Sequence, residues 1–367
     1  MSYLASSTHL NNWIFTKEQL QQVSKLKLNK VKKQWQMCAA NPLLQRKPRS
    51  FACLIPTTTN AILDESDWND ALEEVALDPL EDPSIFLTPE EEAMVVDFFQ
   101  VQVQRTCTTV FKTSEKVKAA AVLLFKRFYL SNSIMEFHPK NIGATAIYVA
   151  GKVEEQYISV ESLVKLYEGV VNESDVITHE MIVLEGVRFQ LIMYHPFRSL
   201  TGFIDDLRAF YKSRGVDIPI TTLQTLHATA TSCINDLLLT DAPFLYTPAF
   251  LALAGLHLAI TPDMQINVIE YVKSSKRASR QDSTEVQNVI DAIHAIGQLR
   301  ADREKAVVTD AELKPAYKKL KAFHKKASSS SSGGGAAAPQ ASDEEKEPKK
   351  KKHKSDSKKS KKSKKDA

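Results

Sequence analysis

The chain has 367 residues, of which 43% are hydrophobic and 25% charged, which allows for two folded domains and a tail. Glycine is scarce, and no regular alternation of polar and apolar residues stands out, so helices are favoured over a sheet. The net charge of +4 hides an asymmetry: residues 349–367 hold 11 Lys and two Asp, a net +9 that leaves −5 for the rest. A mildly acidic body argues against a nucleic-acid-binding core, and we expect no specific nucleic-acid partner.

The cysteines and the apolar segments exclude further classes. Cys38, Cys53, Cys107 and Cys233 form no C-x-x-C pair and match no histidine spacing, which predicts reduced structural thiols and no metal site. The N-terminal sequence lacks the features of a secretory signal. The longest apolar stretch, around residues 249–260, is too short to cross a bilayer, so we expect no membrane partner.

The N-terminal region, residues 1–37, contains a predicted helix over about 13–37, with Thr16 as its cap and Gln19 three residues on. Residues 38–85 form a different kind of segment, with five prolines and an acidic run from Asp64 to Asp82 that has nine carboxylates and no Lys or Arg. This composition predicts a mostly disordered insertion, and a solvated loop is favoured over a site for a basic partner.

Residues 86–194 predict a first bundle of five helices. It begins at Thr88-Pro89-Glu90-Glu91, where a cap, a first-turn proline and a glutamate three residues after the cap agree. The third helix is apolar on every face, which predicts that its neighbours enclose it. The predicted helices span about 88–110, 114–130, 139–155, 159–167 and 174–190.

Residues 195–300 predict a second bundle that begins after His195-Pro196, because a residue before proline avoids helical geometry. Pro248–Ala259 repeats the pattern of Pro139–Ala150, a proline followed by an apolar helix rich in small residues, so the two bundles are interpreted as repeats. The predicted helices span about 197–213, 220–239, 247–260, 263–273 and 283–300.

The C-terminal part of the chain is predicted as a helix within residues 301–326 and a disordered Lys-rich tail over 327–367. The lysine cluster from Lys349 to Lys354 is typical of a nuclear import signal, and a weak nucleic-acid contact is the alternative.

Motifs for catalysis are missing from the sequence. It has no G-x-S-x-G, its glycines around Lys152 have the wrong spacing for a phosphate loop, and no cysteine has a plausible base nearby in sequence. We therefore expect no catalytic residue and no cofactor.

The end of the third helix distinguishes the two repeats. The first repeat continues into Gly151-Lys152-Val153-Glu154-Glu155, whereas the second has Thr261 where Lys152 would fall. On the fifth helix, Glu180 falls inside an apolar arc, where a carboxylate needs a partner. Two interpretations remain open: Lys152 and Glu180 pair with each other or reach water, or they offer a donor and an acceptor at the rim of an apolar docking surface.

The segments FKRFYL (Phe125–Leu130) and AGKVEE (Ala150–Glu155) resemble the best-marked parts of a cyclin box, and the chain is identified as a member of the cyclin family. The resemblance covers residues 12–37 and 86–326. It implies an all-α fold of two tandem five-helix cyclin-box bundles, flanked by N- and C-terminal helices and followed by the disordered basic tail.

The resemblance also implies a function. The segments Asn12–Phe15, Lys126–Pro139 and Leu239–Pro248 are similar to the cyclin subtype of the CDK-activating kinase. That subtype is a non-catalytic nuclear subunit of the transcription factor TFIIH, whose kinase phosphorylates CDK activation loops and the C-terminal domain of RNA polymerase II. The implied partners are a cyclin-dependent kinase and TFIIH assembly subunits.

In cyclins, residues at the positions of Lys152 and Glu180 hold the chain near the kinase's regulatory helix, and Glu154 and Glu155 are weaker candidates for the same role. The alternatives are another transcription-associated adaptor, either a Mediator-type cyclin or a TFIIB-like factor, and a helical scaffold without a kinase partner. A TFIIB-like factor adds a zinc ribbon, whereas this sequence has no C-x-x-C. A scaffold leaves Lys152 and Glu180 unexplained.

Overall fold

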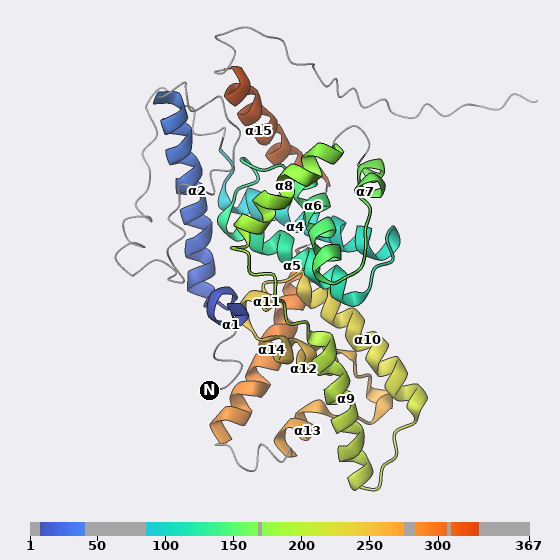
Figure 1. The fold of residues 1–367 in the computed structure, drawn as a ribbon. Coiled ribbons are helices and arrows are strands. Elements are labelled where there is room, and N and C mark those ends of the chain that lie inside the picture. The colour runs from blue at the N-terminus through green and yellow to red at the C-terminus, as the bar shows by residue number, and fades with distance from the viewer. Residues whose placement is uncertain (1–7, 41–85, 168–170, 275–282, 307–309, 330–367) are drawn as a thin grey trace, which may run out of the picture. The chain divides into compact units, whose positions relative to one another are not determined.

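A computed structural model describes residues 8–40, 86–167, 171–274, 283–306 and 310–329. The regular structure of these ranges is helical, without strands, as the sequence predicts (Figure 1). The described residues all belong to one compact unit.

The first bundle is built around α6, which contacts α4, α5, α7 and α8. Side chains on all sides of α6 are buried, among them Ile142, Ala146 and Ile147, so the helix is enclosed by its neighbours as its sequence predicts. The five helices are α4 (Pro89–Thr109), α5 (Glu115–Ser131), α6 (Pro139–Val153), α7 (Val160–Leu166) and α8 (Glu173–Gly186).

The second bundle repeats this plan around α12, which contacts α9, α10, α13 and α14. Its central helix is apolar and buried in the same way, with Leu251, Ala252 and Leu256 almost inaccessible to solvent. The helices are α9 (Pro196–Ser213), α10 (Ile220–Leu238), α11 (Ala242–Leu245), α12 (Pro248–Ala259), the 3-10 turn η5 (Pro262–Met264), α13 (Val268–Ser274) and α14 (Ser283–Lys305).

Several helix ends differ from the sequence-based expectations. α8 ends at Gly186 rather than near residue 190, because Arg188 and Phe189 both adopt a left-handed backbone with φ of 56°. The helix expected over 263–273 is split into η5 and α13 by Gln265, which is also left-handed. α11 was not predicted at all, and α14 runs past residue 300 to Lys305.

The N-terminal region forms two helices, α1 (Thr8–Trp13) and α2 (Lys17–Ala40), instead of one starting at residue 13. The predicted cap of α2 is present: the Gln19 amide donates to Thr16 Oγ1 at 3.2 Å, and Gln19 Oε1 accepts from the Thr16 amide at 2.8 Å. The same reciprocal arrangement joins Thr88 and Glu91 at the start of α4, as predicted.

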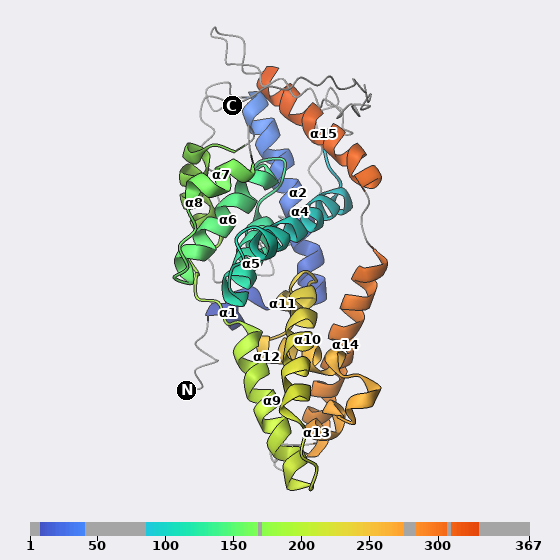
Figure 2. The ribbon, with the colours of Figure 1, turned by 90° about the vertical axis from the view of Figure 1, so that its right-hand side faces the viewer.

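Both flanking helices pack on the first bundle. Lys27 of α2 lies 3.2 Å from the carboxylate of Glu92 in α4. On α15 (Asp310–Ser329), Lys319 pairs with Glu91 at 2.7 Å, and Phe323 packs edge-to-face on Phe86. α15 contacts α4, whereas α2 contacts α4 and α5 (Figure 2).

The two bundles meet where α5 and α4 face the end of α10. Lys126 Nζ, buried on α5, donates to the carbonyl oxygens of Leu238, at 3.2 Å, and Thr240. Gln100 of α4 donates to the carbonyl oxygen of Leu239 at 2.7 Å. Burial lowers the pKa of Lys126 to about 8, against the pull of Asp241 and Asp97.

The predicted insertion and tail fall mainly outside the described residues. Of the insertion, residues 38–40 end α2 and 41–85 are not described; of the tail, residues 327–329 end α15 and 330–367 are not described.

Candidate partner-docking site

Lys152 lies in the last turn of α6, with about half of its side chain exposed. Gly151 precedes it, and a Cβ atom there would lie 2.7 Å from the carbonyl oxygen of Gln156. Since no side chain tolerates that approach, the glycine lets the chain fold back tightly at the end of the helix. The enclosed helix therefore brings a single ammonium group to the surface at its C-terminal end, where the helix dipole favours a cation.

Glu180 lies on the neighbouring α8, and its carboxylate binds Lys152 through both oxygens, with Nζ–O distances of 2.7 and 2.9 Å. The two side chains are 49% and 23% exposed, so the pair lies at the surface and a partner can reach it. Lys152 Nζ also lies 4.3 Å from the ring centroid of Tyr148, one turn earlier on α6. Partial burial lowers the pKa of Lys152, but the hydrogen bonds to Glu180 and Tyr148 outweigh it and raise the pKa.

Exposed apolar side chains lie on α8 and in the segment just after it. Ile177 and Met181, four residues apart, flank Glu180 on the same side of the helix, and Phe189 and Ile192 come next in the chain. Each of the four is more than half exposed to solvent. We call Lys152, Glu180, Ile177, Met181, Phe189 and Ile192 the docking surface.

The backbone of the turn after α8 is unusual. Arg188 and Phe189 are consecutive non-glycine residues with positive φ, a conformation that costs energy and is concentrated at functional sites. The Phe189 amide donates to the carbonyl oxygen of Leu184 at 2.8 Å, which closes the turn. This turn therefore leaves a large aromatic side chain, Phe189, 58% exposed to solvent.

Glu154 and Glu155 lie just past α6 but differ in environment. Glu154 lies 2.9 Å from Nε2 of His195, at the entry to the second bundle, and is 17% exposed. Glu155 is exposed and has a φ of 57°. A role in partner binding stays a prediction for both residues, and it is the weaker one for Glu154 because its carboxylate is already engaged.

The sequence indicates Lys152 and Glu180 as a candidate pair, but it does not indicate most of the residues around them. It placed Ile177 within the apolar arc around Glu180, and the structure exposes it, whereas Val176 and Val183 of that arc are buried. Met181, Phe189 and Ile192 were not singled out. Tyr148 could have been found, because it precedes Lys152 by one helical turn.

Other kinds of site find no support in the described residues. Within the described ranges, no three His, Cys, Asp or Glu side chains gather where a metal ion could bind. No helix there is long and apolar enough to cross a membrane. Cys107 and Cys233 are buried free thiols, and burial raises the pKa of Cys107 to about 12, so this thiol is unreactive.

Each of the two bundles matches a known domain family. The cyclin N-terminal domain family matches residues 87–192, and the cyclin C-terminal domain family matches residues 195–301. The chain belongs to the cyclin family. Together the two matched segments span more than half of the chain, and the two repeats are its cyclin boxes.

Curated relatives include several cyclins of the H type. The chain is 35% identical over 210 residues to Cyclin-H1-1 of Arabidopsis thaliana, an alignment covering 56% of this chain and 61% of the relative. It is 31% identical over 183 residues to a putative cyclin-H of Dictyostelium discoideum, covering 49% of this chain and 62% of the relative. The chain thus spans about three fifths of the length of these relatives.

A solved structure extends the likeness to nearly the whole chain. One chain of the CAK complex of Chaetomium thermophilum, bound to ATP-gamma-S, superposes with a TM-score of 0.63 at 22% identity. The superposition covers 92% of this chain and 97% of that one. At this level of identity, the likeness establishes the fold.

Proposed function

We propose that this cyclin is a non-catalytic regulatory subunit that binds and activates a cyclin-dependent kinase through the docking surface. The observation that carries the proposal is the exposed Lys152–Glu180 pair, with the exposed side chains of Ile177 and Met181 beside Glu180 on α8. An ammonium and a carboxylate can bind backbone or charged groups of a partner helix, and the apolar side chains supply buried area on association.

The mechanism follows from what a kinase requires. Protein kinases are active when a lysine and a glutamate of their own form an ion pair, and the glutamate is carried on a mobile helix. A surface that binds this helix in its active position shifts the population toward the active kinase. The cyclin supplies binding energy and no catalytic group.

The proposed complex is the CDK-activating kinase of TFIIH, acting in the nucleus on CDK activation loops and on the C-terminal domain of RNA polymerase II. The H-type names of the relatives support this assignment. So does the resemblance of Lys126–Pro139 and Leu239–Pro248 to that subtype. The further partners are the kinase subunit and the assembly subunits of TFIIH.

A charge swap separates docking from a merely intramolecular ion pair. In the double variant Lys152→Glu/Glu180→Lys the two side chains can still pair, but the partner meets reversed charges. We expect the affinity for the purified kinase subunit, measured by titration calorimetry, to fall by on the order of 2–5 kcal/mol in Lys152→Ala or Glu180→Ala. The swap should not restore it.

The matched control is the exposed ion pair of the second bundle, Arg214–Glu270. Arg214→Ala should leave kinase affinity unchanged, because this pair lies outside the docking surface. If the swapped variant binds the kinase with wild-type affinity, the docking role is wrong and Lys152–Glu180 is only a structural ion pair.

A further inference from the structure

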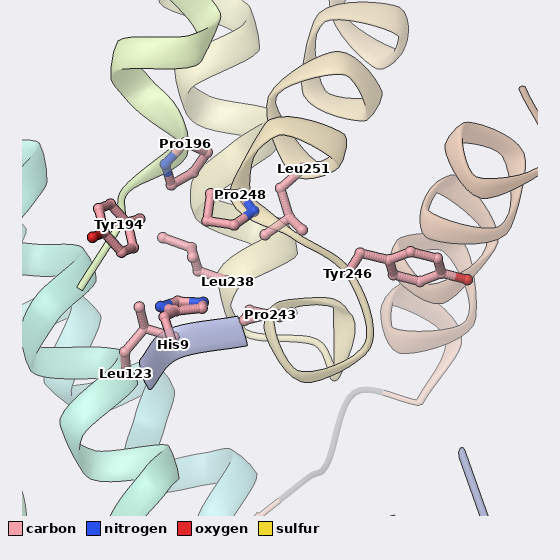
Figure 3. Close-up of a pocket in the computed structure, with 9 residues that line it drawn as sticks. All are labelled: His9, Leu123, Tyr194, Pro196, Leu238, Pro243, Tyr246, Pro248 and Leu251. Atoms are coloured by element: carbon pink, nitrogen blue, oxygen red, sulfur yellow. The ribbon is translucent and has the colours of Figure 1, made fainter. Parts of the chain in front are cut away.

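The short helix α1 inserts two side chains where the two bundles meet. His9 and Trp13 are only 3% and 5% exposed, although they come from a helix of six residues outside both family matches. Figure 3 shows the His9 ring beside Leu123 of α5, and the ring of Tyr194, in the segment between the bundles, lies edge-on with its centroid 6.0 Å away. The shallow pocket at this place is lined by side chains of both bundles and of α1.

The buried Arg127 of α5 joins α1 to the segment after α8. Its side chain is 1% exposed; Nη2 lies 3.0 Å from Nδ1 of His9, and the guanidinium lies 4.6 Å from the ring centroid of Trp13. Its Nη1 donates to the carbonyl oxygen of Gln190 at 3.5 Å. Burial, with Arg127 beside it, lowers the pKa of His9 to about 4, so the ring is neutral near pH 7 and can accept from Arg127.

Gln190 is held a second time, through its side chain. Trp13 Nε1 donates to Gln190 Oε1 at 2.7 Å, across 177 positions of the sequence. The Gln190 amide in turn donates to the carbonyl oxygen of Val187 at 3.1 Å. Residues 187–190 form the turn that holds Arg188 and Phe189 in the left-handed region, and such a turn persists only where its surroundings determine it.

We propose that His9 and Trp13 are positioning residues for kinase docking: through Arg127 and Gln190 they brace the turn 187–190 and so set where Phe189 and Ile192 stand. This inference rests on the proposed function, since it assigns the N-terminal helix a part in shaping the docking surface. Phe189 lies at the strained turn and Ile192 two residues past Gln190, so a shift of Gln190 moves both.

The rival interpretation is that these contacts only anchor the N-terminal segment. Phe15 provides a control that separates the two, because it anchors the same segment to the second bundle. Its ring packs edge-to-face on Phe244 at 6.3 Å, and its amide donates to the carbonyl oxygen of Phe244 at 2.7 Å. Loosening Phe15 weakens the anchor and leaves the contact between Trp13 and Gln190 in place.

The first measurement is amide hydrogen exchange at residues 188–190 of the full chain without kinase. Trp13→Phe keeps an aromatic ring beside Arg127 and removes the N–H donor to Gln190. We expect exchange at these amides to be about tenfold faster in Trp13→Phe and unchanged in Phe15→Leu. Equal exchange in wild type and Trp13→Phe would overturn the brace.

The second measurement is a double-mutant cycle on kinase affinity. Trp13→Phe should weaken binding about fivefold in the wild-type chain and have no further effect in a Phe189→Ala/Ile192→Ala background, because the brace acts through those two residues. Additive losses would overturn the positioning role. The exchange result does not depend on the kinase, so accelerated exchange with unimpaired binding of the charge-swapped variant would count against the proposed function alone.

Discussion

The two cyclin boxes share a plan but differ in what they bury. Apart from Thr240, every buried polar or charged side chain in the described part of the chain comes from the N-terminal segment or the first box. The core of the second box is almost entirely apolar. Most helices of the two boxes also begin differently: side chains cap α4, α5, α6 and α7, whereas α9, α10 and α12 have no side-chain cap. In the second box, α13 (Val268–Ser274) is an exception, because Asn267 accepts from the Glu270 amide at 3.1 Å.

The buried polar side chains of the first box bind elements from outside it. Glu92 receives Lys27 of α2, Lys126 caps the end of α10, and Arg127 receives His9 of α1. Since a buried charge is tolerated only with a partner, each of these groups specifies which element packs beside it. We infer that the first box determines which elements pack on it and carries the proposed docking surface, while the second box has few such buried polar contacts.

The largest expected effect comes from removing a buried arginine of the first box. Arg127→Ala deletes a fully buried side chain and its contacts with His9 and Trp13, and we expect the free energy of unfolding to fall by about 3 kcal/mol. Arg300 of the second box, which pairs with Asp236 at 2.9 Å and is 28% exposed, is the control. Arg300→Ala should cost under about 1 kcal/mol in urea unfolding. Equal losses would end the proposed contrast.

An intermediate effect is expected from acid. The pKa of His9 is about 4 in the folded chain against 6.5 unfolded, so between these values the unfolded chain binds more protons and stability falls as the pH falls. At pH 5 the loss relative to pH 7 should be about 2 kcal/mol from His9, and burial of His195 acts in the same direction.

Urea unfolding at pH 7 and pH 5 measures this loss. His9→Gln should reduce the difference between the two pH values by most of that amount. In the second box, the half-buried His257 also has a lowered pKa, so His257→Gln is the matched control and should change the difference less. A larger change from His257→Gln would place the acid sensitivity in the wrong box.

The smallest effect concerns helix caps. Thr88→Ala removes the reciprocal cap of α4 and should cost about 1 kcal/mol of stability in thermal or urea unfolding. Thr247, at the start of α12, makes no side-chain cap bond, and Thr247→Ala should cost less than about 0.5 kcal/mol. A comparable cost at both positions would show that the caps do not distinguish the boxes.

Much of the fold could be predicted because its signals are local. Thr16 with Gln19 and Thr88 with Glu91 mark helix starts by hydrogen bonds within one turn, and the apolar faces of α6 and α12 identify the two enclosed helices. The end of α8 could not be predicted, because Arg188 and Phe189 adopt a conformation that their residue types disfavour. The bond from the distant Trp13 to Gln190 stabilises this turn together with the hydrogen bonds within it.

Only part of the candidate site could be predicted from the sequence. Lys152 and Glu180 could be predicted from helical spacing and from the contrast with Thr261 in the second repeat. The exposure of Phe189 could not, because phenylalanine is among the residue types most often buried. The hydrogen bond between Trp13 and Gln190 joins residues 177 positions apart, so no pattern in a short stretch of sequence predicts it.

The contacts of Lys126 across the two boxes affect how the molecule unfolds. The Lys126 side chain is buried, and its acceptors are the carbonyl oxygens of Leu238, at the end of α10, and of Thr240, just after it. Separating the boxes would remove both acceptors from Lys126 and the acceptor from Gln100, and water would have to replace them. The cores are also shared, because Leu239 packs in the core of the first box and Ala119 of α5 in that of the second, so we expect the two boxes to unfold in one cooperative transition.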